Sequence, residues 1–400
     1  MKRFQSAVAI LAGIACSVLL ASCDDSGGDK TYGGKYDQQG YAVLALEDGG
    51  CVVAGESVAS SGNPGDLLAM RLDSGGKVLW SRTTGGSGRD CAYDVKAAPG
   101  GGFIVAGVTE SMGPGDPGNY GSYGNMMAVK IDGSGNIQWS RVYGHDLYES
   151  ATGVAVTSDG GYLLGGYTHS YGSSRCIVVK IDAAGMMEWE GIYGTGDTTD
   201  VAYSVKTAPD GGYILAGSRI DGTGRAMGLL IRTDSLGGEL WSSVYGETSR
   251  FNWIRDIDVG NDGSIVAAGY RGNDILPENQ CDAWFFRVDP AGCILWERLF
   301  GGSYLDIAYA IKKDGDGYVI SGETRSYGSG SEYSADLWVS RLDGGGNQVW
   351  SRTYGDGAND AGYDIDLLAN GGYVVAGSTF AGLSNGYDVY VLKLDEDGNY

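Results

Sequence analysis

The chain has 400 residues, of which 71 are glycine and only 7 are proline. Hydrophobic residues make up 42% and aromatic residues 11%, enough apolar matter for a packed core, which excludes wholesale disorder. The formal net charge of −22 would repel a phosphate backbone and argues against a nucleic-acid partner. The only histidines are His145 and His169, which excludes most histidine-based metal sites.

The first 22 residues have the features of a secretory signal. A basic start precedes an apolar, uncharged stretch over 7–20, which is shorter than the roughly 20 residues that a membrane-spanning helix needs. This stretch ends in Leu-Ala-Ser-Cys at 20–23, which resembles the lipobox of bacterial lipoproteins. The resemblance implies cleavage after Ser22 and a lipid anchor such as palmitate on Cys23. The alternative is an ordinary signal peptide followed by a chance cysteine.

Residues 23–29 form a short polar tether that reaches only about 20 Å when extended. We therefore expect the folded body, residues 30–400, to lie close to a membrane. The predicted location is the bacterial cell envelope, at the outer membrane or the periplasmic face of the inner membrane. Asp24, directly after the lipidated cysteine, resembles an inner-membrane retention signal of enterobacteria.

Besides Cys23, five cysteines remain after the signal: Cys51, Cys91, Cys176, Cys281 and Cys293. An odd number cannot all pair within the chain. We expect mostly small buried side chains, with Cys51 and Cys91 as the one pairing to consider. No Cys-x-x-Cys spacing occurs, so zinc is not suggested.

Internal repetition is the main signal of the sequence. The string Asp-x-x-Gly-x-x-x-Trp occurs six times, with its tryptophans at 80, 139, 189, 241, 296 and 350. A seventh copy begins at Asp395, and the chain stops at Tyr400 before its tryptophan. A second marker is an apolar strand that ends in glycine, at 55, 107, 166, 217, 269, 322 and 377. Both markers give seven units.

Each unit contains four short strands, with the Asp-x-x-Gly string as the hairpin turn between the third and the fourth. Four antiparallel strands at this period are typical of a propeller blade. The predicted fold is therefore an all-β, seven-bladed β-propeller with four antiparallel strands per blade. Residues 30–34 match the end of a Trp strand, so we expect this N-terminal strand to join the last blade and close the ring, with Gly28 where the tryptophan would stand. The alternative architecture is a linear β-solenoid.

The units resemble the seven-bladed β-propeller repeat family of bacterial secreted proteins, through strings such as Tyr143-Gly144, Ala216-Gly217 and 392–395. The Asp-x-x-Gly-x-x-x-Trp string is also similar to the Trp-docking repeat of quinone-dependent dehydrogenases. A related fold occurs in an envelope lipoprotein of the outer-membrane assembly machinery. These resemblances imply an architecture and no particular activity.

An acidic or amide residue stands just before each predicted first strand. These residues are Gln38, Asp90, Glu149, Asp200, Asn252, Asp306 and Asp360. In a closed ring they would fall on one rim near the axis, where they would bind a basic partner. We predict no cofactor and no metal-ligand set; the alternative is a divalent cation such as calcium. The other interpretation of the rim residues is that each caps a turn or bonds the neighbouring blade.

Three tryptophans fall outside the repeat register: Trp253, Trp284 and Trp338. We expect them, and Trp253 beside Asn252 above all, to serve partner recognition. The loops over 111–125, 272–280 and 326–334 differ most between units, and their Gly, Ser and Tyr content is frequent in recognition surfaces. Plain turn filling is the alternative for these loops.

Enzyme signatures are missing, because the chain contains neither a Gly-x-Ser-x-Gly elbow nor a phosphate-binding loop. We therefore name no catalytic residue. The predicted function is a monomeric, lipid-anchored, non-catalytic binding platform for protein or glycan partners. One alternative is an envelope assembly or scaffold lipoprotein. The other is an enzyme that uses the central channel, such as a lyase, a glycan hydrolase or a quinone-dependent oxidoreductase.

Overall fold

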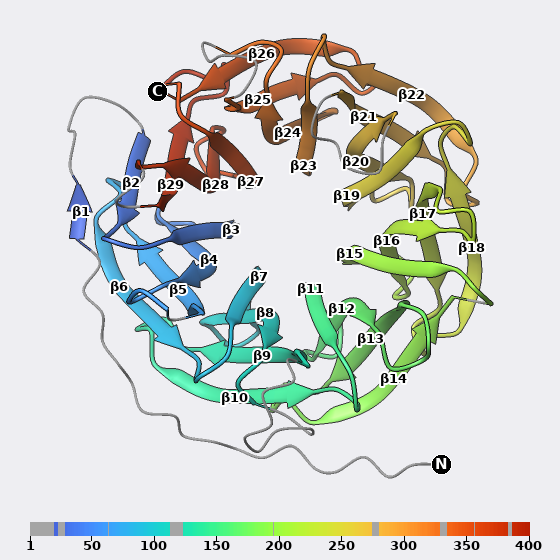
Figure 1. Cartoon of the computed structure of the whole chain (residues 1–400), viewed down its shortest axis with the longest axis horizontal. Coiled ribbons are helices and arrows are strands. Elements are labelled where there is room, and N and C mark those ends of the chain that lie inside the picture. The colour runs from blue at the N-terminus through green and yellow to red at the C-terminus, as the bar shows by residue number, and fades with distance from the viewer. Residues whose placement is uncertain are drawn as a thin grey trace.

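Strands make up all the regular structure in the described part of the chain. The computed structural model describes residues 20–22, 29–62, 64–112, 123–194, 196–273, 280–328, 334–355, 357–382 and 386–400. Cys23 and most of the predicted signal lie outside the described residues, as do the central parts of the three variable loops. Seven sheets surround one axis (Figure 1), which confirms the predicted seven-bladed β-propeller.

Within each blade the strands follow one another from the axis outward. The innermost strands are β3 (Gln38–Ala45), β7 (Asp90–Ala97), β11 (Glu149–Val156), β15 (Thr199–Thr207), β19 (Phe251–Val259), β23 (Asp306–Asp314) and β27 (Asp360–Leu367). The second strands are β4 (Cys51–Ser57), β8 (Phe103–Thr109), β12 (Tyr162–Thr168), β16 (Tyr213–Ile220), β20 (Ile265–Gly272), β24 (Gly317–Thr324) and β28 (Tyr373–Phe380).

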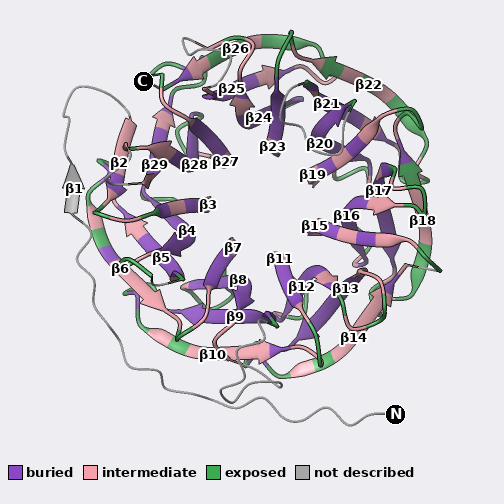
Figure 2. Ribbon diagram, viewed as in Figure 1, coloured by how far each residue is buried: buried purple, intermediate pink, exposed green. Residues whose placement is uncertain are grey.

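The third strands are β5 (Asp66–Leu72), β9 (Asn125–Ile131), β13 (Arg175–Ile181), β17 (Ala226–Thr233), β21 (Cys281–Val288), β25 (Asp336–Leu342) and β29 (Tyr387–Leu394). The outer strands are β6 (Val78–Thr84), β10 (Ile137–Tyr143), β14 (Met187–Tyr193), β18 (Glu239–Tyr245), β22 (Ile294–Phe300), β26 (Gln348–Tyr354) and, in the last blade, β2 (Asp29–Gly33). Burial is densest in the second and third strands (Figure 2), because both faces of these strands pack against neighbouring blades.

The N-terminal strand closes the ring, as the sequence predicts. Strand β2 pairs antiparallel with β29, so the last blade is built from both ends of the chain. The Tyr32 hydroxyl donates a hydrogen bond to the Gly76 carbonyl of the first blade and fastens the seam. Strand β1 (Leu20–Ser22) adds a fifth strand beside β2. Cleavage after Ser22 would remove β1 and leave seven blades of four strands.

Each outer strand docks on the turn of the next blade. The Trp80 indole donates to the Gly133 carbonyl at 3.2 Å, and equivalent bonds join Trp241 to Pro290, Trp296 to Gly344 and Trp350 to Glu396. Four tyrosines, Tyr143, Tyr193, Tyr245 and Tyr354, donate to Gly185, Gly237, Gly292 and Gly398 in the same way. The repeated Trp and Gly of the sequence are thus the two halves of one contact between blades.

The five cysteines are free thiols, with Cys293 exposed and the others buried. Cys51 and Cys91 do not pair in this structure. Burial raises the pKa of the Cys51 thiol to about 12, so this group stays protonated and behaves as a small apolar side chain.

A β-bulge interrupts the pairing of the first two strands in every blade. In blade 4, for example, the register shifts between Ala202 and Ser204, which leaves Tyr203 unpaired. At the bulge the backbones of the first and second strands come very close to each other, and the recurring glycine of the second strand makes room for this contact. A Cβ on Gly217 would lie 1.9 Å from the Val201 carbonyl oxygen. Because a bulge re-aims the residue it leaves unpaired, each blade sends one side chain toward the axis.

Candidate functional site

The bulged residues line a cavity of about 440 Å³ on the propeller axis. We call these seven residues the belt: Tyr41, Tyr93, Thr152, Tyr203, Arg255, Tyr309 and Tyr363. Five of the seven are tyrosines, so the wall of the cavity is both aromatic and rich in hydroxyl groups. The channel is therefore not filled by aliphatic side chains.

The belt rings touch one another around most of the axis. The ring centroids of Tyr41 lie 5.7 Å from Tyr93 and 5.4 Å from Tyr363. Tyr363 in turn lies 5.2 Å from Tyr309. These spacings fall in the range of favourable aromatic pairs, so the rings hold one another in place.

Arg255 takes the place of a tyrosine in blade 5. Its guanidinium carbon lies 4.8 Å from the centroid of the Tyr203 ring and 5.3 Å from that of Tyr309. A cation between two aromatic faces is attracted by both ring quadrupoles. The belt therefore continues from Tyr309 through Arg255 to Tyr203, and its gap is at Thr152.

The phenol groups of the belt are poor acids. Burial raises the pKa of all five belt tyrosines above the ordinary value. The Tyr309 hydroxyl donates to Glu323 Oε1 at 3.0 Å, and burial also raises the pKa of that carboxyl. The belt hydroxyls consequently remain protonated at neutral pH.

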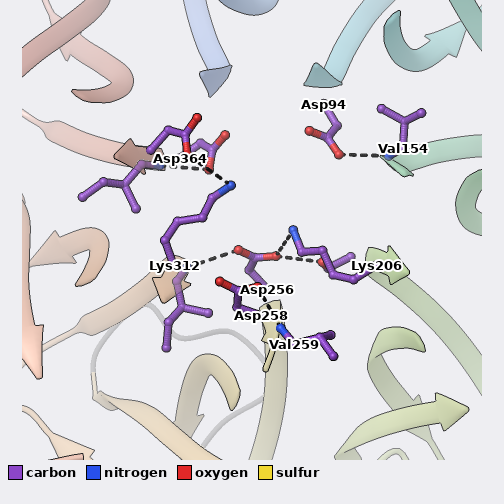
Figure 3. A network of polar contacts seen from close by, with 12 residues as sticks. Asp94, Val154, Lys206, Asp256, Asp258, Val259, Lys312 and Asp364 are labelled. Carbon is purple, nitrogen blue, oxygen red and sulfur yellow. Dashed lines mark hydrogen bonds and ion pairs between the residues drawn. The ribbon is translucent and has the colours of Figure 1, made fainter. Parts of the chain in front are cut away.

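A layer of opposite charges lies next to the belt along the inner strands. We call it the charged layer: Asp94, Lys96, Lys206, Asp256, Lys312 and Asp364, all of which line the cavity. Figure 3 shows Lys206 and Lys312 extending toward the axis, where each meets an aspartate. Lys206 Nζ lies 3.2 Å from Asp256, Lys312 Nζ lies 3.6 Å from Asp366, and Lys96 pairs with Asp94.

The aspartates of this layer also join neighbouring blades. Asp94 accepts the backbone N–H of Val154 at 2.9 Å, and Asp364 accepts that of Val43 at 2.9 Å. An inner strand is the edge of its sheet, and each aspartate satisfies an edge N–H of the next blade. Burial raises the pKa of Asp364 to about 6. These carboxylates are therefore committed to the scaffold as well as to the cavity.

A second hollow of about 630 Å³ adjoins the central cavity. Gln39 and Tyr41 line both spaces, so the two spaces are neighbours at blade 1. The outer hollow contains Arg89 paired with Glu56.

An aromatic group adjoins the gap in the belt at blade 3. Tyr167 lines the cavity and stacks on Tyr148 with ring centroids 5.9 Å apart. The exposed His169 lies against both rings, at 5.5 Å from Tyr148 and 5.6 Å from Tyr167. The other histidine, His145, forms a hydrogen bond with Glu190, with 3.1 Å between Nε2 and Oε2. This bond raises the pKa of His145.

The predicted rim residues are buried at the start of each inner strand. Asp90, Glu149, Asp200, Asn252 and Asp306 are 0% exposed, Asp360 is 1% and Gln38 is 4%. Their polar atoms bind adjoining loops or the second strand of the same blade: Asp90 accepts from Gly86 and Ser111, Glu149 from His145 and Ser170, Asp200 from Arg219, Asn252 from Arg271, and Asp306 from Gly302 and Ser326. A partner at the rim would meet other groups, because these side chains lie below the surface and organise the loops.

The three tryptophans outside the repeat register divide into two kinds. Trp284 and Trp338 are 0% exposed and lie in the cores of their blades, so the expectation that they recognise a partner is wrong. Their register places them in the third strands, which pack on both faces. Trp253 is half-buried, stacks on Tyr270 and lies 6.0 Å from the belt residue Tyr203. It therefore supports the belt from behind.

Sequence reasoning missed the belt itself. The signal was present, because tyrosine recurs three residues after the rim position at 41, 93, 203, 309 and 363. Regular alternation along a strand assigns each side chain to one face of the sheet and takes no account of a bulge. The bulge changes the direction in which this side chain points, and the recurring glycine of the second strand is the only sequence feature that indicates it.

Within the part of the chain that the structure describes, no helix is long and apolar enough to cross a membrane. Over the same residues, no three histidine, cysteine or carboxylate side chains gather as metal ligands would.

No family model matches the chain, and no curated protein matches it. Solved structures show the same fold. The WD40 domain of Pan2 from Neurospora crassa is 13% identical with a TM-score of 0.55, and the match covers 90% of this chain and 91% of that one. The polysaccharide lyase Uly1 is 12% identical with a TM-score of 0.54, covering 92% of both chains.

An ulvan lyase of polysaccharide lyase family PL25, solved with a bound saccharide of glucuronic acid and sulfated rhamnose, is 11% identical with a TM-score of 0.54. That match covers 92% of this chain and 97% of the lyase. At these identities the likeness concerns the fold, which serves binding domains and enzymes alike.

Proposed function

We propose that this protein is a non-catalytic glycan-binding platform of the bacterial cell envelope and that the belt is its binding site. The observation that carries the proposal is the ring of five tyrosines around a cavity on the axis. Aromatic faces with a few convergent polar groups are the usual lining of a small-ligand site. A sugar ring presents C–H groups to an aromatic face and hydroxyls at its edge, and the belt offers partners for both.

Two further features support a glycan over a folded protein as the partner. The cavity is enclosed by seven inner strands, so a chain segment fits where a broad protein surface would not. The neighbouring hollow over blade 1 offers a second site for an extended ligand. Two of the structural neighbours are polysaccharide lyases by name, and one of them was solved with a bound saccharide, which supports a saccharide ligand for a propeller of this size.

Binding is a better account of the belt than catalysis. A tyrosine that removes a proton must ionise near neutral pH, whereas burial raises the pKa of the belt phenols. The carboxylates of the charged layer are occupied by lysines and by backbone N–H groups of the next blade. A lyase or hydrolase in the channel remains the alternative from another class.

The anchor is a separate part of the proposal. It rests on the Leu-Ala-Ser-Cys sequence that ends at Cys23, and on the few residues along the sequence between Cys23 and the strand that begins at Asp29. Expression of the whole chain in a bacterium that processes lipoproteins should give a palmitate-labelled product that lacks residues 1–22. The Cys23→Ala chain should be unlabelled and keep its signal. Label retained in Cys23→Ala would contradict the anchor.

A glycan array probed with the full-length chain tests the binding function. We expect binding of wild type and a loss of signal in Tyr309→Ala, because this variant opens the belt beside Arg255. Tyr123→Ala is the matched control, since Tyr123 is 51% exposed and does not line the cavity. Thermal unfolding of each variant separates lost binding from lost folding. Equal array signals from wild type and a folded Tyr309→Ala would contradict the proposed site, and shortened or unsaturated glycans on the array would favour the enzyme.

A further inference from the structure

Arg255 differs from every other cation in the wall of the cavity. The three lysines that line it each have an aspartate partner: Lys96 has Asp94, Lys206 has Asp256 and Lys312 has Asp366. Within the described part of the chain, Arg255 forms neither an ion pair nor a hydrogen bond, and its guanidinium lies over two tyrosine rings. Arg255 is thus a cation of the cavity wall that an anionic group of a ligand can bind.

The two rings also determine which part of Arg255 a ligand would meet. Tyr203 and Tyr309 lie against the guanidinium, with centroid distances of 4.8 and 5.3 Å. A guanidinium donates its hydrogen bonds in its own plane, from N–H groups at its edge. Contact with the aromatic rings restricts the long side chain but does not use these N–H groups. The guanidinium can therefore donate two parallel hydrogen bonds to an acceptor of matching geometry, such as a carboxylate.

Glu323 is an acidic side chain that interacts with the charge of Arg255. Within the described residues, the two groups do not form an ion pair. Glu323 accepts the Tyr309 hydroxyl at 3.0 Å instead. Tyr309 therefore occupies the place between Glu323 and Arg255, with its hydroxyl toward the acid and its ring toward the guanidinium.

We infer that Arg255 selects saccharides that carry a carboxylate, so that the glycan held by the belt is one that contains uronic acid. This inference rests on the proposed function and adds its ligand class. A carboxylate accepts two parallel N–H bonds from a guanidinium, and the pair is stronger than neutral hydrogen bonds. The belt tyrosines bind the rings of the chain, and Arg255 binds the acidic group of one sugar.

The test is isothermal titration of the full-length chain with two matched series of tetrasaccharides. The first series contains glucuronate, galacturonate and mannuronate chains. The second contains the same chains with each carboxyl group reduced to a primary alcohol. We expect at least one acidic chain to bind wild type between about tenfold and a hundredfold more tightly than its reduced counterpart, the range of a charge-assisted hydrogen bond. Added salt should weaken the acidic chain alone.

Variants at two arginines identify the group responsible. Arg255→Gln should bind the acidic and reduced chains equally, and Arg255→Lys, which keeps a point charge without the fork, should fall between this variant and wild type. Arg298→Gln is the matched control, because Arg298 also lies over an aromatic ring, that of Trp296, but on an outer strand. It should keep the preference of wild type.

The outcomes distinguish the two proposals. If both series bind wild type equally, the carboxylate inference is wrong and the glycan platform stands. The same holds if Arg255→Gln keeps the full preference for the acidic chain. If no chain of either series binds, the glycan platform itself fails. The comparison of the two series on wild type needs no variant, so it decides the matter even if a substitution prevents folding.

Discussion

Gly322 lies so close to Ile307 that a Cβ on the glycine would be 1.9 Å from the Ile307 carbonyl oxygen. This approach accompanies the bulge that turns Tyr309 toward the axis. The same relationship recurs in every blade, from Gly55 against Gln39 to Gly377 against Ala361. The recurring glycine is thus a condition for the binding site as well as for the fold.

Gly322→Ala should lower the free energy of unfolding by about 1–3 kcal/mol, because the added methyl group must push the inner strand away. It should also weaken glycan binding, since the displaced strand carries Tyr309. Urea unfolding and titration with a bound glycan measure the two effects. Gly133→Ala is the control: nothing lies within 4 Å of its Cβ position, and it should be close to neutral.

The contact between blades predicts a large effect of Trp80→Ala. Trp80 is 8% exposed and packs on the turn at Gly135, where a Cβ would meet the indole at 2.7 Å. Loss of this side chain should cost about 3–5 kcal/mol of unfolding free energy. The neighbouring Leu79 is 51% exposed, and Leu79→Ala should leave the urea midpoint nearly unchanged. Equal effects of the two substitutions would contradict the docking role of the tryptophan.

The seam between the two chain ends predicts a smaller effect. Tyr32→Phe removes the hydroxyl that donates to Gly76 but keeps the ring, which is 1% exposed. The Gly76 carbonyl then loses its buried partner, and we expect a loss of about 1–3 kcal/mol in urea unfolding. Tyr123→Phe, at an exposed position, should have no measurable effect. An unchanged stability of Tyr32→Phe would mean that the seam depends on the strand pairing alone.

Asp364 predicts a pH-dependent difference in stability. Its pKa is about 6 in the folded protein and 3.8 in its ordinary state, because burial disfavours the carboxylate. A raised pKa means that the folded state binds the proton more tightly than the unfolded state. Below pH 4 the buried carboxyl therefore does not lower the free energy of unfolding. As pH rises through about 6, the loss in the free energy of unfolding grows.

Asp364→Asn removes this titration and keeps an oxygen for the Val43 N–H. Relative to wild type, the variant should gain about 1–3 kcal/mol in unfolding free energy between pH 4 and pH 7.5. Urea unfolding of both chains at the two pH values measures this difference. A difference that stays constant, or that falls with rising pH, would show that Asp364 titrates as an ordinary exposed carboxyl.

Most of the fold could be predicted from the sequence because the residues that form the contacts between blades recur at the same positions in each of the seven units. The Trp80 docking contact, the Asp-x-x-Gly turn and the closing strand at Tyr32 all follow from the spacing of residues along the chain. Each depends on local backbone geometry or on one neighbouring unit, so a periodic pattern is enough to locate it.

The site could be predicted only in part. Asp90 and its counterparts recur because loops need them, and recurrence alone cannot distinguish a buried cap from an exposed ligand. The direction of Tyr203 depends on a bulge, and the freedom of Arg255 depends on which carboxylates lie within reach after folding. Neither property leaves a pattern along the chain.

The most direct test of the account is a crystal structure of the full-length protein soaked with the uronate tetrasaccharide that binds it most tightly in the titrations. The account predicts sugar density on the axis, with a ring against the belt tyrosines and a carboxylate at the edge of the Arg255 guanidinium. Sugar density on the outer strands or the peripheral loops, with the axial cavity free of sugar at a saturating concentration, would contradict it.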